Sequence, residues 1–170
     1  MHSPFDEEAL TAVRSLGDLV AEEGRKVEFL FSNCTGLTAV PEGLFANRPG
    51  VTSFEGCFYD CTGLTAIPAG LFANCPAVTS FKDCFGVCTG LTAVPEGLFA
   101  NCPGVTSFEG CFYGCTGLTG ETPYTMVDGK KIKLWERSPE NGFTKVTSRV
   151  DCFGVCTGLS DYAEIPAGWK

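Results

Sequence analysis

Residues 91–117 read LTAVPEGLFANCPGVTSFEGCFYGCTG, and this stretch decides the fold because the chain repeats it. Nearly the same letters fill each period from residue 37 to residue 117. A fixed period of 27 residues is typical of proteins in which stacked repeats bury apolar faces that one repeat alone would expose. Two columns mark the period: Leu37, Leu64, Leu91 and Leu118, and Cys34, Cys61, Cys88 and Cys115.

The register continues outward in both directions. One period back lies Leu10, in a charged stretch with helical spacing, and forward lies VTSRVDCFGVC at 146–156, after an insertion of 14 residues. The sequence therefore predicts one domain over residues 1–170. Its parts are an N-terminal cap with a degenerate first repeat (1–36), three regular repeats (37–117), an expanded repeat (118–158) with a hairpin insertion at about 120–145, and a C-terminal cap (159–170) whose Trp169 seals the last phenylalanine layer.

Each repeat has two similar halves, and each half opens with a β-prone run, LTAV or VTSF. Phe54, Cys57, Phe58 and Cys61 then stand at i, i+3, i+4 and i+7, the spacing of one helix face. Gly63 suits a left-handed helix cap. We expect an α/β repeat, a leucine-rich-repeat-like solenoid of about five 27-residue coils (short strands plus short helices) with an N-terminal helical cap and a C-terminal β-hairpin insertion. Stacking predicts four buried ladders: Leu37/Leu64/Leu91, Phe45/Phe72/Phe99, Phe54/Phe81/Phe108 and Phe58/Phe85/Phe112.

The run LTAVPEGLF (37–45 and 91–99) and the cadence aromatic-x-x-Cys-x-x-Leu, as in Phe58, Cys61 and Leu64, resemble bacterial leucine-rich repeats of the BspA-like surface-protein type. The resemblance covers residues 10–159, although the period and the Val and Phe substitutions for Leu depart from the commonest consensus. The closing GLSDYAEIPAGWK is also similar to repeat-bearing proteins of gut bacteria and prophages. The resemblance implies a non-enzymatic surface for adhesion or protein binding.

The eleven cysteines, many in CxxxC pairs such as CFYDC at 57–61, permit three interpretations. Disulfides within a pair are disfavoured because helical i, i+4 Cβ atoms lie about 5–6 Å apart, whereas a bridge needs roughly 3.5–4.5 Å. Zinc requires four convergent ligands, and Arg48 replaces one cysteine without disturbing the repeat. Free cysteine also packs as a small apolar side chain. We expect packed thiols, with no disulfide and no metal.

Composition argues against several classes of function. The net charge of −8 disfavours nucleic-acid binding, and no apolar run approaches the roughly 20 residues that span a bilayer. The N-terminus lacks a signal-peptide core, so a cytoplasmic location is expected by default, or a cell-surface or virion location within a larger protein. His2 is the only histidine, and no P-loop or GxGxxG occurs. We therefore expect no catalytic residue, no cofactor and no enzymatic activity.

The insertion is the least repetitive segment, and Asp128-Gly129 between β-prone runs predicts a two-residue hairpin turn. Pairing across this turn places aromatic and basic side chains together, which suits contact with a protein, an acidic glycan or an anionic ligand. Alternatively, the same face folds back and covers the exposed edge of the last coil. The candidate binding residues are Tyr124, Met126, Lys131, Lys133 and Trp135.

The sequence thus predicts a non-enzymatic protein-binding or adhesion module, with contacts made by the strand face of residues 37–117 and by the hairpin. A structural spacer within a cell-surface or phage-tail-like assembly is the alternative. The partner is expected to be an unknown protein or glycan, without membrane insertion, and a monomer is favoured.

Overall fold

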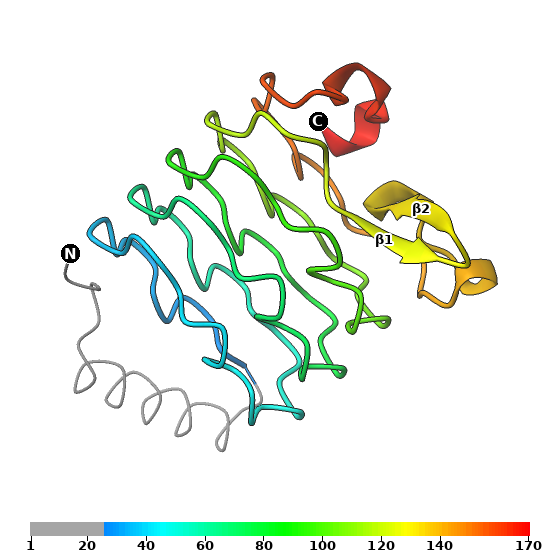
Figure 1. Ribbon diagram of the computed structural model, residues 1–170, viewed down its shortest axis with the longest axis horizontal. Coiled ribbons are helices and arrows are strands. Elements are labelled where there is room, and N and C mark those ends of the chain that lie inside the picture. The colour runs from blue at the N-terminus through cyan, green and yellow to red at the C-terminus, as the bar shows by residue number, and fades with distance from the viewer. Residues whose placement is uncertain (1–25) are drawn as a thin grey trace.

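The structure, a computed structural model, describes residues 26–170, which form a stack of parallel coils (Figure 1). Isolated parallel bridges join equivalent residues of successive repeats, so each repeat lies directly beside the next. The spacing is 27 residues within the regular part and 41 residues across the insertion, as the repeat register predicts. The bridged residues are Lys26, Ser53, Ser80, Ser107 and Ser148.

The predicted fold class, an α/β leucine-rich-repeat-like solenoid with short strands and short helices, is wrong. Residues 26–170 contain no α-helix, and apart from the isolated bridges their only β-strands are β1 (Tyr124–Val127) and β2 (Lys130–Lys133), which pair antiparallel in the insertion. The remaining elements are 3-10 turns: η1 (Leu134–Glu136), η2 (Pro139–Asn141), η3 (Tyr162–Glu164) and η4 (Ala167–Trp169). Within this part of the chain no helix has the length and apolarity to cross a membrane. The predicted N-terminal helical cap lies outside the described residues.

Hydrogen bonding explains why the helical spacing did not produce a helix. In an α-helix every amide donates to the carbonyl four residues earlier. Here the amides of Phe54 and Phe58 donate instead to carbonyls of the next coil, at 3.0 and 2.8 Å. The amides of Cys57 and Cys61 donate to carbonyls three residues earlier, at 3.1 and 3.2 Å. The chain therefore alternates between turn bonds and bonds to the next coil, and the four predicted side chains still point inward.

Two left-handed residues in this segment of each coil produce the alternation. Gly56 and Asp60 have φ values of 59° and 60° in the segment that the spacing predicted as a helix. Equivalent positions in the other coils are also left-handed, including Val87 (φ 59°) and Val155 (φ 65°). A β-branched residue is strained there, because its Cβ crowds the backbone. Gly63 does not have a positive φ, so its predicted role as a left-handed cap is also wrong.

Replacing Val155 with asparagine should therefore stabilise the protein. Asn33 occupies the equivalent position at φ 63°, and Val155 is 51% exposed, so little packing is lost. Removing the strain of a β-branched residue in the left-handed conformation should raise the free energy of unfolding by about 1 kcal/mol. The melting temperature should rise by about 2–4 °C. Thermal unfolding measures the change. Val150→Asn is the control, since Val150 is exposed without a positive φ; an equal response of both variants would contradict the strain argument.

The core is one continuous cluster of stacked side chains, and the four predicted ladders are all buried. The rings of Phe58 and Phe85 are nearly parallel, with centroids 5.4 Å apart. Each fully buried phenylalanine contributes roughly 1.5–3 kcal/mol relative to an exposed one. At the C-terminal end Trp169 stacks on Phe153, and its carbonyl accepts the Phe153 amide at 2.8 Å, so Trp169 seals the last layer as predicted.

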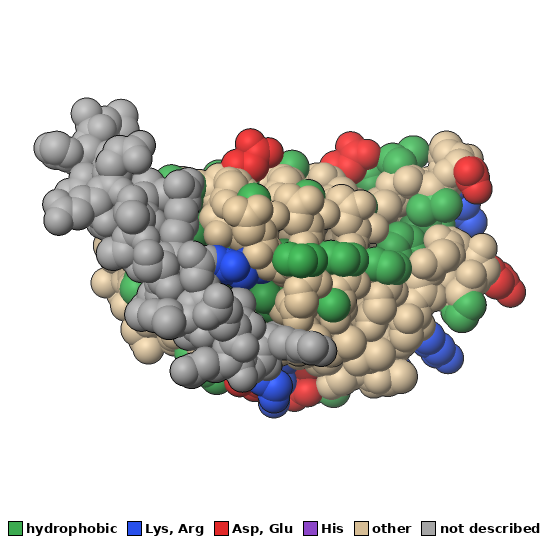
Figure 2. Space-filling view, turned by 90° about the horizontal axis from the view of Figure 1, so that it is seen from below, with side chains coloured by type: hydrophobic (Ala, Val, Ile, Leu, Met, Phe, Trp, Pro, Cys, Tyr) green, Lys and Arg blue, Asp and Glu red, His purple; other side chains and the backbone are tan. Residues whose placement is uncertain are grey.

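The surface also follows the repeat. On the face drawn in Figure 2, a row of hydrophobic side chains crosses neighbouring coils, and acidic side chains stand along its edges. Because the coils are nearly identical in sequence, each places the same kind of residue at the same point. The insertion interrupts this uniformity and projects to one side of the stack (Figure 1).

Candidate functional site

The hairpin predicted at Asp128-Gly129 is present. Both turn residues have positive φ, 50° and 78°, as a tight hairpin turn requires. The register pairs Met126 with Lys131 and Tyr124 with Lys133. Because directly opposed residues share one face of an antiparallel pair, these four side chains gather on the same side of the hairpin.

Tyr124, Met126 and Lys131 form the outward part of this face, which we call the hairpin face. The Lys131 ammonium lies 4.6 Å from the centre of the Tyr124 ring, within cation–π range. Met126 is 44% exposed, and few other large apolar side chains among residues 26–170 are exposed. Lys131 also pairs with Glu121, whose Oε2 lies 3.0 Å from its Nζ. The face thus joins apolar, aromatic and charged groups in a small area.

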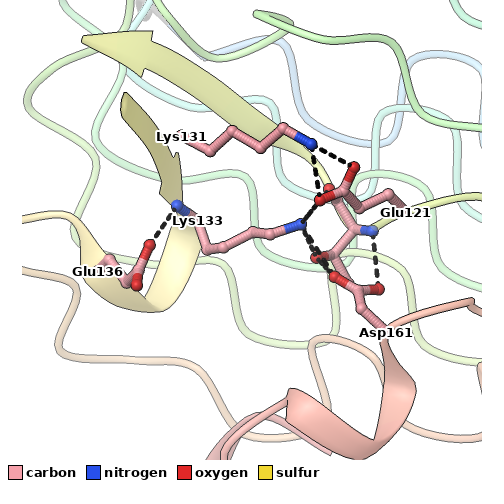
Figure 3. A network of polar contacts seen from close by, with 6 residues as sticks. Glu121, Lys131, Lys133, Glu136 and Asp161 are labelled. Carbon is pink, nitrogen blue, oxygen red and sulfur yellow. Dashed lines mark hydrogen bonds and ion pairs between the residues drawn. The ribbon is translucent and has the colours of Figure 1, made fainter. Parts of the chain in front are cut away.

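Lys133 has a different environment, because its ammonium is buried in a polar network (Figure 3). Its Nζ donates to Glu121 Oε1 at 2.7 Å, to Asp161 Oδ2 at 2.9 Å and to Thr122 Oγ1 at 3.1 Å. Asp161 accepts in addition from the Thr122 amide at 3.0 Å and from the Thr122 hydroxyl. Lys133 therefore fastens the hairpin to the C-terminal segment and has no donor left for a partner.

The network lowers the pKa of both carboxyl groups, Asp161 and Glu121. Burial alone would raise the pKa of Asp161, but hydrogen bonds from Thr122 and Lys133 outweigh burial, and the pKa lies below its ordinary value. Hydrogen bonds from Lys133 and Lys131 likewise lower the pKa of Glu121. Both carboxylates are therefore ionised near neutral pH, which keeps the ion pairs intact.

Trp135 points into the C-terminal end of the stack. Its ring meets Phe153 and Trp169 edge to face, with centroids 6.4 Å apart in each case. The two alternatives for the insertion thus apply to different residues. Lys133 and Trp135 hold the insertion against the stack, whereas Tyr124, Met126 and Lys131 face outward.

Arg137 binds backbone carbonyls of the coil at residues 91–117, and the sequence analysis did not identify it as a candidate. One repeat earlier the same kind of contact is made by a cysteine: Cys102 Sγ donates to the carbonyls of Phe72 and Cys75, at 3.7 and 3.3 Å. Arg137 takes the place of the next cysteine, because its Nη1 and Nη2 donate to the carbonyls of Phe99 and Cys102. Burial lowers the pKa of Arg137 to about 10. Its Nε is buried and has no hydrogen-bond partner among the described residues.

Glu121, Thr122 and Asp161 were also missed by the sequence reasoning. Asp161 lies 39 residues from Thr122, in the segment that follows the last coil. Neither spacing nor a local motif connects the two, so no pattern in the sequence predicted this contact. The basic cluster around Lys133 was visible, but its partners were not.

The chain is cysteine-rich, and all eleven cysteines are free thiols within the described residues. Ten are buried at inward positions, and several thiols donate to a carbonyl of the previous coil, as Cys88 does to Phe58 at 3.1 Å. Burial is the main cause that raises the pKa of Cys61 to about 12 and of Cys75 to about 11. Such thiols stay protonated and unreactive. Within residues 26–170, no three His, Cys, Asp or Glu side chains converge as metal ligands do.

Thiol labelling of the native protein should therefore distinguish one reactive cysteine from ten protected ones. Cys34 is exposed, and the other ten are buried. Alkylation of the native protein at mildly alkaline pH should modify Cys34 rapidly, while the buried thiols react only on unfolding. Mass spectrometry of the intact protein during labelling measures this. Rapid native modification of several cysteines, or a Cys34→Ser variant that is still rapidly labelled, would contradict the packing described.

The chain matches no protein-family model and no curated protein sequence. Its resemblance to BspA-like surface proteins therefore stays a prediction from the repeat sequence.

Proposed function

We propose that the protein is a non-enzymatic binding or adhesion module that contacts a protein partner through the hairpin face of Tyr124, Met126 and Lys131. The observation that carries the proposal is the contrast between this face and its support. Met126 is 44% exposed on a hairpin whose base is fixed by the buried Lys133–Asp161 pair. A rigid, preordered surface loses little conformational entropy on binding.

The residue types favour a protein over other partners. Tyrosine and methionine are enriched at the centres of protein interfaces, and methionine adapts its shape to apolar side chains. Lys131 adds a positive charge that suits an acidic residue beside the apolar contact. The buried cysteines support a role without covalent catalysis, because burial raises their pKa values and removes the thiolate that acts as a nucleophile.

Photo-crosslinking at Met126 tests the proposal. The sequence contains only Met1 and Met126, so photo-reactive methionine places the crosslinker on the hairpin face and at one terminal position. We expect a discrete protein to crosslink in extracts of the cells that encode this chain. The Met126→Leu variant should lose that crosslink, and its core should be unaffected because the swap nearly conserves volume. A crosslink that persists in Met126→Leu would arise from Met1 and contradict the assignment.

Charge reversal gives a second measurement on the same face. Lys131→Glu should weaken capture of the crosslinked protein, whereas Val150→Glu, at an exposed apolar position outside the hairpin, should not. Equal capture by both variants would contradict the hairpin face as the site. If no protein crosslinks at all, the proposal fails, and the chain is better described as a structural spacer.

A further inference from the structure

A cleft of about 480 Å³ opens at the C-terminal end of the stack, apart from the hairpin face. It lies between η1, the start of the last coil and η4. Its lining includes the apolar residues Trp135, Val146 and Trp169 and the basic residues Arg137, Lys145 and Arg149. Polar and apolar groups contribute about equally to its walls, and concave sites of several hundred Å³ that combine apolar side chains with a few charged groups are typical of small-molecule binding.

The positive charge of the cleft is not neutralised within the described part of the chain. Within residues 26–170, no carboxylate forms an ion pair with Arg137, Lys145 or Arg149. Glu136 lines the cleft, but its Oε2 accepts the Lys133 amide at 3.0 Å. Three cations beside one engaged carboxylate are unusual in a chain of net charge −8. The cleft therefore attracts anions although the protein as a whole repels them.

The buried guanidinium of Arg137 strengthens this argument. Arg137 is 4% exposed, and its Nη groups donate to the carbonyls of Phe99 and Cys102. Its Nε is left without a partner, and a buried donor of this kind costs free energy until it is satisfied. Because no carboxylate of the described residues pairs with it, Arg137 adds a fixed positive charge to the wall of the cleft.

The two tryptophans add an aromatic surface to the cleft. Trp135 and Trp169 meet at 67° with ring centroids 6.4 Å apart, and Trp135 is half-buried, so part of its indole is open to the cleft. A flat ring packs well on an indole. A compact ion such as inorganic phosphate would leave this aromatic wall without a contact.

We propose that this cleft binds a carboxylate carried on a six-membered ring. Arg149 and Lys145 hold the carboxylate, and the indole of Trp135 packs on the ring. A single negative charge fits best, because Glu136 at the same cleft repels a second one. Aromatic acids, whose ring is flat, and uronic acids, whose puckered ring presents a face of C–H groups to the indole, share this chemistry.

Tryptophan fluorescence tests the proposal directly, because both tryptophans of the sequence line the cleft. Benzoate and glucuronate serve as probes, with benzamide and glucose as their neutral counterparts. At least one acid should change the emission in a saturable way. The affinity of its neutral counterpart should be lower by about tenfold or more. A response to benzoate alone identifies an aromatic acid, and a response to glucuronate alone identifies a uronic acid. If neither acid changes the emission, or if acid and neutral counterpart bind equally, the proposal is overturned.

Charge-neutralising variants locate the binding. Arg149→Gln and Lys145→Gln should each weaken the responding acid by about tenfold or more, and both side chains are exposed, so folding should be retained. Lys130→Gln removes the same charge at the hairpin tip and should leave the affinity unchanged. Equal affinity of Arg149→Gln and the unaltered protein would overturn the proposal. Met126→Leu should not alter the titration, so the cleft and the hairpin face are tested independently.

Discussion

Replacing Asp161 with alanine should lower the free energy of unfolding by about 3 kcal/mol. Asp161 is 8% exposed and accepts from Lys133 Nζ at 2.9 Å and from the Thr122 amide at 3.0 Å. Its removal leaves a buried ammonium with only Glu121 as a counter-charge, and it leaves the Thr122 amide without its acceptor. Broken buried pairs typically cost 3–5 kcal/mol, and the remaining Glu121 contact places this case at the lower end.

Thermal unfolding measures the effect, which should appear as a fall in melting temperature of about 6–12 °C for a chain of this length. Glu164→Ala is the matched control, because Glu164 lies in the adjacent turn η3 and is exposed. Its effect should stay within about 0.5 kcal/mol. Similar effects of the two variants would show that the network does not fasten the insertion to the C-terminal segment.

The same network predicts how stability depends on pH. The pKa of Asp161 is lower in the folded protein than its ordinary value of about 3.9. Asp161 therefore stabilises the fold above this ordinary value, and the contribution is lost as the pH falls through the lower folded pKa. The stability difference between the unaltered protein and Asp161→Asn should be largest near neutral pH and shrink in acid. Denaturant unfolding at several pH values measures it; a difference that stays constant would contradict the ion pair.

Replacing Gly90 with alanine should cost about 3 kcal/mol, because the previous coil leaves no space for a side chain. A Cβ on Gly90 would lie 2.6 Å from the carbonyl oxygen of Thr62 and 3.2 Å from that of Leu64. Both contacts are with backbone, which cannot move without separating the coils. Gly63 and Gly117 meet equivalent carbonyls at 2.6 Å, so the glycine column records how closely the coils approach.

Gly104→Ala is the matched control and should act in the opposite direction. A Cβ on Gly104 would meet nothing closer than the Val78 carbonyl oxygen at 3.9 Å, and Ala77 already occupies the equivalent position one repeat earlier. Alanine there should be neutral or stabilise by up to about 1 kcal/mol, because it restricts the unfolded chain. Denaturant unfolding of both variants decides the matter, and equal losses would show that glycine is needed for another reason.

Much of the stack could be predicted from the sequence because apolar side chains recur at a fixed period. The period of 27 placed Phe58 over Phe85, and their rings lie 5.4 Å apart. Asp128-Gly129 likewise predicted its hairpin, since a turn with two positive φ values depends on only a few adjacent residues. Burial could be predicted from the regular spacing of apolar residues, and the turn could be predicted from adjacent residues.

The secondary structure was predicted wrongly for a specific reason. Phe54, Cys57, Phe58 and Cys61 have the spacing of a helix face, but spacing does not show where the backbone amides find their acceptors. Every second amide of this segment donates to a carbonyl of the next coil. Because these amides are not available for helical hydrogen bonds, the segment forms successive turns instead of a helix.

The sequence by itself determined the repeat, its buried ladders and the position of the hairpin, because each follows from local residue types or their period. Only the tertiary structure decided that Lys133 and Trp135 are anchors while Tyr124, Met126 and Lys131 face outward. It also decided that Arg137 and the two tryptophans share a cleft. These assignments depend on partners far along the chain, such as Asp161, 28 residues beyond Lys133. Residues so distant meet only when the stack and its C-terminal end have formed, and no spacing in the sequence records that meeting.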